Sequence, residues 1–234
     1  MKKYLPILLI VMIFGTAAAQ DVVVVQKSEK EFRKAKSKEP FQYLESGIDS
    51  TRLTYVATLE VSGLNNPSLF DMFKKLKDQA KRLGANSYKL RKYSQATIHI
   101  VADVYRAPEE VLDQNKTLKP QNTIFVFAGD PFEKTGYYTF EMNGIGKTVK
   151  NGTYYKYTLH EGEQVKLKKG AITGTIMWVK WKPNQLPNYL TIRGFNDEAV
   201  VKRTTQSESF KEGKFHTVDS GLAGLLVSVL EEKD

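Results

Sequence analysis

Residues 53–90 read LTYVATLEVSGLNNPSLFDMFKKLKDQAKRLGANSYKL, and this stretch decides the fold of the first half of the chain. Apolar and polar side chains alternate from Leu53 to Val61, and this period of two residues predicts a β-strand. Asn66 and Pro67 then form a helix start, with Asn66 as the N-cap and Pro67 in the first turn. The apolar residues that follow recur at steps of three and four, which predicts a helix with one buried stripe.

Gly84 is placed to end this helix, because glycine adopts the left-handed backbone conformation without a Cβ clash. A second strand is predicted through Tyr88 and Leu90, and a third from Thr97 to Tyr105, where the alternation returns. An edge strand is compatible with Val22 to Val25. The first half is therefore predicted as an α+β domain in which one helix packs on a small sheet.

The end of the helix and the start of the next strand read QAKRLGANSY, from Gln79 to Tyr88. This stretch resembles the core of small bacterial envelope domains with a helix-to-LGAN turn. These include the outer-membrane stress-sensor lipoprotein of the Rcs pathway and the heavy-metal-binding-domain family. The resemblance covers residues 53–105 and implies a small sheet with a helix packed on it. The Rcs sensor carries disulfides and a lipid anchor, whereas this chain has no cysteine, so no functional residue is transferred.

The second half has a different pattern. Residues 107–122 are polar, contain two prolines and are predicted as a linker with a short helix at 109–113. Beyond them, short strands separated by Gly- and Asn-containing turns indicate a mostly-β domain, a small sandwich or barrel. Residues 123–205 resemble small exported bacterial β-sandwich modules of unknown function. Apolar residues at helical spacing after Gly221 predict a C-terminal helix. The predicted strands are 123–128, 137–142, 153–160, 164–168, 174–182, 189–194 and 199–204.

The N-terminus has the order of a secretory signal peptide. Lys2 and Lys3 precede an apolar run from Leu5 to Phe14, and Ala17-Ala18-Ala19 supplies the cleavage site. The apolar run is shorter than the ~20 residues that span a bilayer. We therefore expect cleavage after Ala19. The predicted organisation is a signal peptide (1–19), an α+β domain (20–106), a linker (107–122) and a β domain with a terminal helix (123–234).

The absence of cysteine limits the possible compartments and anchors. Without cysteine the exported chain forms no disulfides and cannot carry a cysteine-linked lipid anchor. We expect a periplasmic or secreted bacterial protein that is not a lipoprotein and has no transmembrane segment after cleavage. The formal charge is +9, and without Lys2 and Lys3 it is +7. This charge favours anionic lipid, lipopolysaccharide or acidic glycan as partners, or it serves solubility alone; nucleic acid is not an expected partner there.

Two motifs resemble catalytic or binding signatures without completing them. Residues 144–148 (GIGKT) resemble the end of a phosphate-binding loop, but Glu141 stands where the first glycine is required. We interpret them as a hairpin turn. His160 and Glu161 begin like a zinc-binding helix motif, but Gln164 occupies the position of the second histidine. The sequence thus assigns no catalytic, metal-binding or cofactor-binding residues, and no cofactor.

Two groups of residues are candidates for a ligand surface. Aromatic side chains assigned to the outward face of strands could stack on a sugar or a peptide, or could pack against a neighbouring module. Basic side chains on the polar face of the predicted helix could bind phosphates or lipid headgroups, or could form a solvated face. The aromatic candidates are Tyr137, Tyr154 and Trp178, and the basic candidates are Lys74, Lys81 and Arg82.

Three hypotheses for the function follow. The leading one is a non-enzymatic, two-domain envelope protein that binds a partner or a component of the cell envelope. The second is a glycan- or anionic-polymer-binding protein that uses the aromatic and basic side chains. The third is a hydrolase whose site is assembled from residues distant in the sequence. The pattern of motifs favours the non-enzymatic hypotheses.

Overall fold

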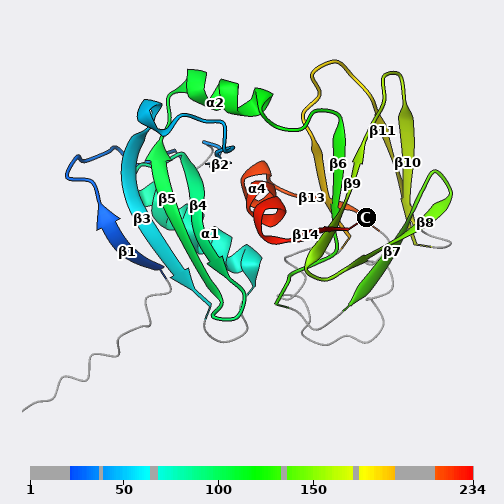
Figure 1. Ribbon diagram of the computed structural model, residues 1–234, viewed down its shortest axis with the longest axis horizontal. Helices are drawn as coiled ribbons and strands as arrows, with labels where there is room; N and C mark the ends of the chain where they lie inside the picture. The colour runs from blue at the N-terminus through cyan, green and yellow to red at the C-terminus, as the bar shows by residue number, and fades with distance from the viewer. Residues whose placement is uncertain are drawn as a thin grey trace, which may run out of the picture.

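The computed structural model describes residues 22–36, 39–63, 68–132, 136–170, 174–192 and 214–233. Within these residues the protein is mostly β, with three sheets and three α-helices (Figure 1). The α-helices are α1 (Leu69–Arg82), α2 (Glu109–Thr117) and α4 (Ser220–Val229), and a short 3-10 helix spans Ser50–Arg52. None of the described helices is long and apolar enough to cross a membrane. The signal peptide and the predicted strand 199–204 lie outside the described residues.

Each sheet has its own strand order. Sheet A has the order β1-β3-β5-β4-β2, sheet B the order β13-β12-β6-β9-β14, and sheet C the order β11-β10-β7-β8. The strands of sheet A are β1 (Val22–Lys27), β2 (Gln42–Tyr43), β3 (Thr54–Ser62), β4 (Ser87–Ser94) and β5 (His99–Arg106). Those of sheet B are β6 (Thr123–Phe127), β9 (Thr153–Thr158), β12 (Asn188–Thr191), β13 (His216–Thr217) and β14 (Glu231–Lys233). Those of sheet C are β7 (Tyr137–Met142), β8 (Ile145–Lys150), β10 (Gln164–Lys169) and β11 (Thr175–Lys180).

Sheet A and α1 have the arrangement predicted from residues 53–105. β3, β5 and β4 pair antiparallel, and β1 adds to the outer edge of β3. The apolar stripe of α1 is buried, and Leu69, Leu76 and Ala80 have no exposed surface. An isolated helix of this length is marginal in water, so burial of the stripe is the main reason why α1 forms.

The start of α1 differs from the prediction. The N-cap is Ser68 and the helix begins at Leu69, whereas the predicted cap, Asn66, lies outside the described residues. A carboxylate from the second half of the chain completes the cap. Asp130 accepts a hydrogen bond from the Ser68 Oγ (3.0 Å) and another from the Leu69 backbone N–H (2.5 Å). A negative charge at a helix N-terminus is favourable, so Asp130 ties the β6–β7 loop to α1.

Sheets B and C share one apolar cluster. Phe140 and Met142 of β7 and Leu159 after β9 are buried in it, and Tyr138, Tyr155 and Tyr157 pack at its margin, which confirms the predicted sharing of a face. Six of the predicted strands correspond to β6, β7, β9, β10, β11 and β12.

One strand of sheet C was not predicted. The turn at Asn143-Gly144 is confirmed, because both residues have positive φ, 52° and 82°, as a two-residue hairpin turn requires. Only the first residue of GIGKT, Gly144, belongs to this turn, and the rest of it begins strand β8, which pairs with β7 from Ile145 to Lys150. Gly146 within β8 lowers its strand propensity, which hides β8 in the sequence.

The C-terminal helix packs against both halves of the chain. α4 lies between sheet A and sheet B (Figure 1), and Leu222, Leu225 and Leu226 share a buried cluster with Phe125 and Phe127 of sheet B and with α1 and the core of sheet A. The Tyr88 hydroxyl donates a hydrogen bond to the Gly221 carbonyl (2.8 Å). The helix was predicted to dock on the β domain, and its contact with sheet A was not foreseen.

Residues 107–122 also make specific contacts. They contain α2, which is longer than the predicted helix at 109–113. The Asn115 side chain is fully buried and accepts a hydrogen bond from the Glu45 N–H (2.8 Å), while its amide donates to the Tyr43 carbonyl (2.9 Å). α2 is thereby attached to β2 and to the segment that follows it.

Candidate functional site

The structure places the three predicted aromatic side chains in two different environments. Trp178 and Tyr137 are exposed on sheet C, with 58% and 68% of their surface accessible. Tyr154 points the other way from the sheet B–C cluster, as predicted, but it is only 6% exposed, because it packs on Phe125 and Phe127. Of the two roles open to the aromatic candidates, Tyr154 therefore has the packing role, and only Trp178 and Tyr137 are available to a ligand.

Trp178 lies on the open face of sheet C, the face opposite the buried cluster. Here Ile176, Trp178 and Lys180 follow one another at alternate positions of β11. β10 pairs beside them in register, with Lys166 opposite Trp178 and Lys168 opposite Ile176. Side chains directly opposite one another on neighbouring strands are about 5 Å apart. Each exposed apolar residue of β11 therefore has a lysine as its neighbour.

The lysines of this face have few negative partners. The Lys166 Nζ lies over the Trp178 ring, 5.7 Å from its centre, at cation–π distance. The Lys168 Nζ is 3.7 Å from a Glu141 carboxylate oxygen on β7. Within the described part of the chain, Lys166 and Lys180 have no carboxylate within 4.0 Å. The open face of sheet C thus joins an exposed aromatic ring to two lysines, Lys166 and Lys180, that have no carboxylate partner among the described residues.

Tyr137 belongs to the same face but not to the same place on it. Leu167 of β10 pairs with both Met142 of β7 and Met177 of β11. Trp178 is one residue from this row, and Tyr137 lies five residues from it in the opposite direction. At about 3.3 Å per residue the two rings are roughly 20 Å apart along the strands. They do not form one platform, and among the described residues of this face Ile176, the exposed apolar neighbour, lies at the Trp178 end.

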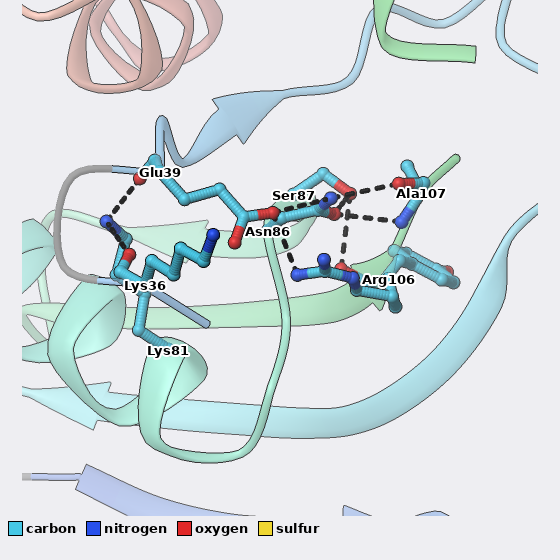
Figure 2. Close-up of polar contacts among 8 residues, drawn as sticks. Lys36, Glu39, Lys81, Asn86, Ser87, Arg106 and Ala107 are labelled. Atoms are coloured by element: carbon cyan, nitrogen blue, oxygen red, sulfur yellow. Dashed lines mark hydrogen bonds and ion pairs between the residues drawn. The ribbon is translucent and has the colours of Figure 1, made fainter. Parts of the chain in front are cut away.

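The basic residues of α1 do not form a free patch. Lys74 and Arg82 are exposed, but Lys81 donates hydrogen bonds to the backbone carbonyls of Lys36 and Glu39. Figure 2 shows its side chain reaching from the end of α1 toward that segment. Partial burial lowers the pKa of Lys81. The basic candidates lie on α1 and the aromatic candidates on sheets B and C, so the structure does not bring them together.

The LGAN turn has a structural role. Gly84 has φ of +94°, as predicted, and an added Cβ would lie 2.5 Å from the Phe32 Cβ. The buried Asn86 side chain pairs with Ala107 like a strand, accepting from its N–H (2.8 Å) and donating to its carbonyl (2.9 Å) (Figure 2). Glu39 lies against the same amide (3.4 Å). The motif therefore extends the pairing of β4 and β5 beyond the ends of the two strands.

The histidines lie in three separate segments: His99 in β5, His160 in the turn after β9 and His216 in β13. The His99 Nε2 is 2.9 Å from a Glu60 carboxylate oxygen. In the part of the chain that the structure describes, no three His, Asp or Glu side chains group as metal ligands would. The histidines are thus not assembled into one site.

Sequence reasoning missed Lys166, Lys168, Lys180 and Ile176 as members of the candidate surface. The signal was present, because residues 164–169 (QVKLKK) and 175–180 (TIMWVK) both alternate. Neither segment alone predicts how the two strands pair, and this pairing places Lys166 beside Trp178. Comparison with protein-family models, with curated proteins and with solved structures finds no match to this chain.

Proposed function

We propose that this protein is an exported, non-enzymatic module that binds a component of the bacterial cell envelope through the open face of sheet C. The observation that carries the proposal is the exposed Trp178, with Ile176 beside it and Lys166 and Lys180 around it. Monomeric proteins seldom leave apolar side chains clustered on a sheet face unless a partner covers them. Lysines with no carboxylate partner among the described residues support an acidic partner.

Export is supported by the N-terminal sequence, in which a basic start, an apolar run and Ala17-Ala18-Ala19 follow one another. The mature protein begins at Gln20 in this proposal and is periplasmic or secreted. Mass spectrometry of the protein recovered from the periplasm or medium tests this point. A first peptide that starts at Gln20 supports export, and an intact N-terminus on a cytoplasmic protein contradicts it.

The proposal includes two domains, one of α+β type over residues 20–106 and a β-sandwich over 123–234, joined by 107–122. Support comes from sheet A being built only from the first part of the chain and sheets B and C only from the second. α4 belongs to the second part by sequence and packs on both. In this proposal α4 holds the two domains rigidly together, and the open face of sheet C faces the ligand.

Binding to the envelope is tested by sedimentation. The mature protein is mixed with washed envelope fragments at low salt and the bound fraction is measured after centrifugation. We expect the wild type to sediment with the fragments and Trp178→Ala to remain largely in solution. The matched control is Tyr137→Ala, which removes an equally exposed aromatic ring from the other end of the same face. Equal binding of Trp178→Ala and wild type contradicts the proposed surface.

A further inference from the structure

We infer that the ligand of the open face of sheet C is a linear polysaccharide that bears acidic groups, and that it lies along β11. This inference rests on the proposed function and adds the chemical class of the ligand. It follows from the order of side chains along β11 and β10, from their charges and from the flatness of a sheet face.

The β11 side chains form a row that suits a repeating polymer. Ile176, Trp178 and Lys180 are two residues apart from one another, so that they project from the same face at intervals of about 7 Å. All three residues belong to one strand, so the row follows the direction of β11. A linear polymer that lies along the strand contacts the three side chains in turn.

Trp178 is the stacking residue of this row. The ring is 58% exposed, and Lys166 approaches it at 5.7 Å from the ring centre. An exposed indole presents a flat apolar surface that matches the apolar C–H face of a pyranose ring, while the sugar hydroxyls remain in water. The cation–π contact restricts the ring before the ligand arrives, which lowers the entropy lost on binding.

The lysines select the acidic polymer. Lys166 lies opposite Trp178 on β10 and Lys180 two residues further along β11, and neither has a carboxylate within 4.0 Å among the described residues, whereas Lys168 has Glu141 at 3.7 Å. Carboxylates or phosphates on sugars that flank the stacked ring would lie near these ammonium groups. Their attraction to exposed lysines is screened by salt, so binding should weaken steadily as the ionic strength rises.

A membrane surface suits this face less well than a polysaccharide does. The exposed apolar side chains, Ile176 and Trp178, are in the middle of a strand, and each has a lysine directly beside it. Insertion of either side chain among acyl chains would take its neighbouring lysine toward the hydrocarbon, which is costly. A polysaccharide needs no insertion, because it covers the ring while it leaves the ammonium groups in water.

The test uses two acidic probes, oligogalacturonate, which carries carboxylates, and a phosphate-bearing polysaccharide. The methyl ester of the oligogalacturonate keeps the sugar rings and removes the charge. We expect at least one acidic probe to bind, and binding of the ester to be about tenfold weaker than that of the acid. Calorimetric titration at low salt measures each affinity, and circular dichroism checks that each variant is folded.

Variants locate the binding. Trp178→Ala should weaken binding of the acidic probe about tenfold, and the double change Lys166→Gln with Lys180→Gln should weaken it about fivefold and flatten its salt dependence. Tyr137→Ala should bind a short oligosaccharide as the wild type does, because that ring lies roughly 20 Å away. An equal loss in Tyr137→Ala contradicts the placement of the ligand.

Two further arms separate this inference from the proposed function. Failure of both acidic probes, or equal affinity for acid and ester, overturns the polysaccharide; Trp178-dependent sedimentation with envelope fragments would still support the proposed function. Trp178-dependent binding to phosphatidylglycerol vesicles that exceeds binding to the saccharides assigns a lipid surface in place of the polysaccharide. If the wild-type protein neither binds the acidic saccharides nor sediments with envelope fragments, both proposals are wrong.

Discussion

The open faces of sheets A and C are built by the same alternation of side chains, yet they handle polar groups in opposite ways. On the open face of sheet A, the Asp103 carboxylate accepts a hydrogen bond from the Thr58 hydroxyl (2.6 Å), and its other oxygen is 3.2 Å from the Arg91 Nε. The Tyr55 hydroxyl is 2.8 Å from the Thr58 hydroxyl. This face pairs its own charges.

The open face of sheet C has one ion pair among the described residues. It carries four lysines and one glutamate, and the glutamate is 3.7 Å from one of the lysines. Polar groups that bond to one another within a sheet stabilise it but are not free to bind a partner. Exposed lysines beside an aromatic ring contribute little to stability and are free to bind one. The difference indicates which face is structural and which face binds.

The largest expected effect comes from breaking the polar network of sheet A. Asp103→Ala removes the acceptor of the Thr58 hydroxyl and leaves Arg91 without its partner, while Thr58 stays buried. We expect the free energy of unfolding to fall by about 2 kcal/mol, measured by urea denaturation. Sedimentation with envelope fragments, measured where the variant is folded, should not change. A stability equal to that of the wild type would show that the network is not structural.

The second-largest effect is expected at Trp178, where a substitution should weaken binding and leave stability nearly unchanged. Trp178→Ala should change the free energy of unfolding by no more than about 0.5 kcal/mol, because the ring is mostly solvated. Its binding to envelope fragments should nevertheless fall about tenfold. Denaturation and sedimentation of the same preparation supply both values. A marked loss of stability would mean that Trp178 supports the fold, and would argue against its role in binding.

A smaller effect distinguishes the carboxylates of the two faces. Glu141→Gln removes the one negative charge near Lys168, so an acidic ligand should bind about twofold more tightly. Glu60→Gln, on sheet A, removes the neighbour of His99 and should leave that binding unchanged. Titration of both variants at one low salt concentration measures the contrast. Weaker binding of Glu141→Gln would indicate that the ligand is not acidic.

The smallest effect is expected at Tyr93 of sheet A, whose hydroxyl is an exception to the pairing of polar groups. The buried Tyr93 hydroxyl has no hydrogen-bond partner among the described residues, and burial, with a contribution from the Asp130 charge, raises the pKa of Tyr93 to about 12. Folding therefore favours the protonated phenol. The protonated Tyr93 contributes its full stability below about pH 10, the pKa of tyrosine in the unfolded chain. This contribution is lost as the pH rises toward 12.

Tyr93→Phe tests this exception. The variant should be as stable as the wild type or slightly more stable near neutral pH, because an unpartnered hydroxyl is removed. It should also lose less stability between about pH 10 and about pH 12. Urea denaturation at several alkaline pH values makes the comparison. A steeper alkaline loss in Tyr93→Phe than in the wild type would contradict the buried, protonated state of Tyr93.

Much of the fold could be predicted because its elements are set by local patterns. Alternation from Leu53 to Val61, the apolar stripe of α1 and the left-handed Gly84 are each readable within a few residues. The N-cap was misplaced because its partner, Asp130, lies some sixty residues away in the sequence. β8 was missed because Gly146 weakens the strand pattern of a segment that is held by pairing with β7.

The candidate site was harder to predict for a related reason. Alternation separates the two faces of a strand but does not show which of them is covered. Tyr154 and Trp178 were therefore treated alike, although α4 and sheet B bury the first and leave the second exposed. The lysines beside Trp178 come from β10, and only the register of β10 and β11 reveals them. Long-range pairing carries the information that the local sequence lacks.

Hydroxyl-radical footprinting on envelope fragments tests the central claim most directly, because it compares the two open faces in one sample. Oxidation of exposed aromatic side chains is measured by mass spectrometry with and without the fragments. The account predicts that Trp178 is protected, while Tyr55 and Tyr105 on sheet A are oxidised equally in both samples. Protection of Tyr55 and Tyr105 with Trp178 still fully reactive would contradict it.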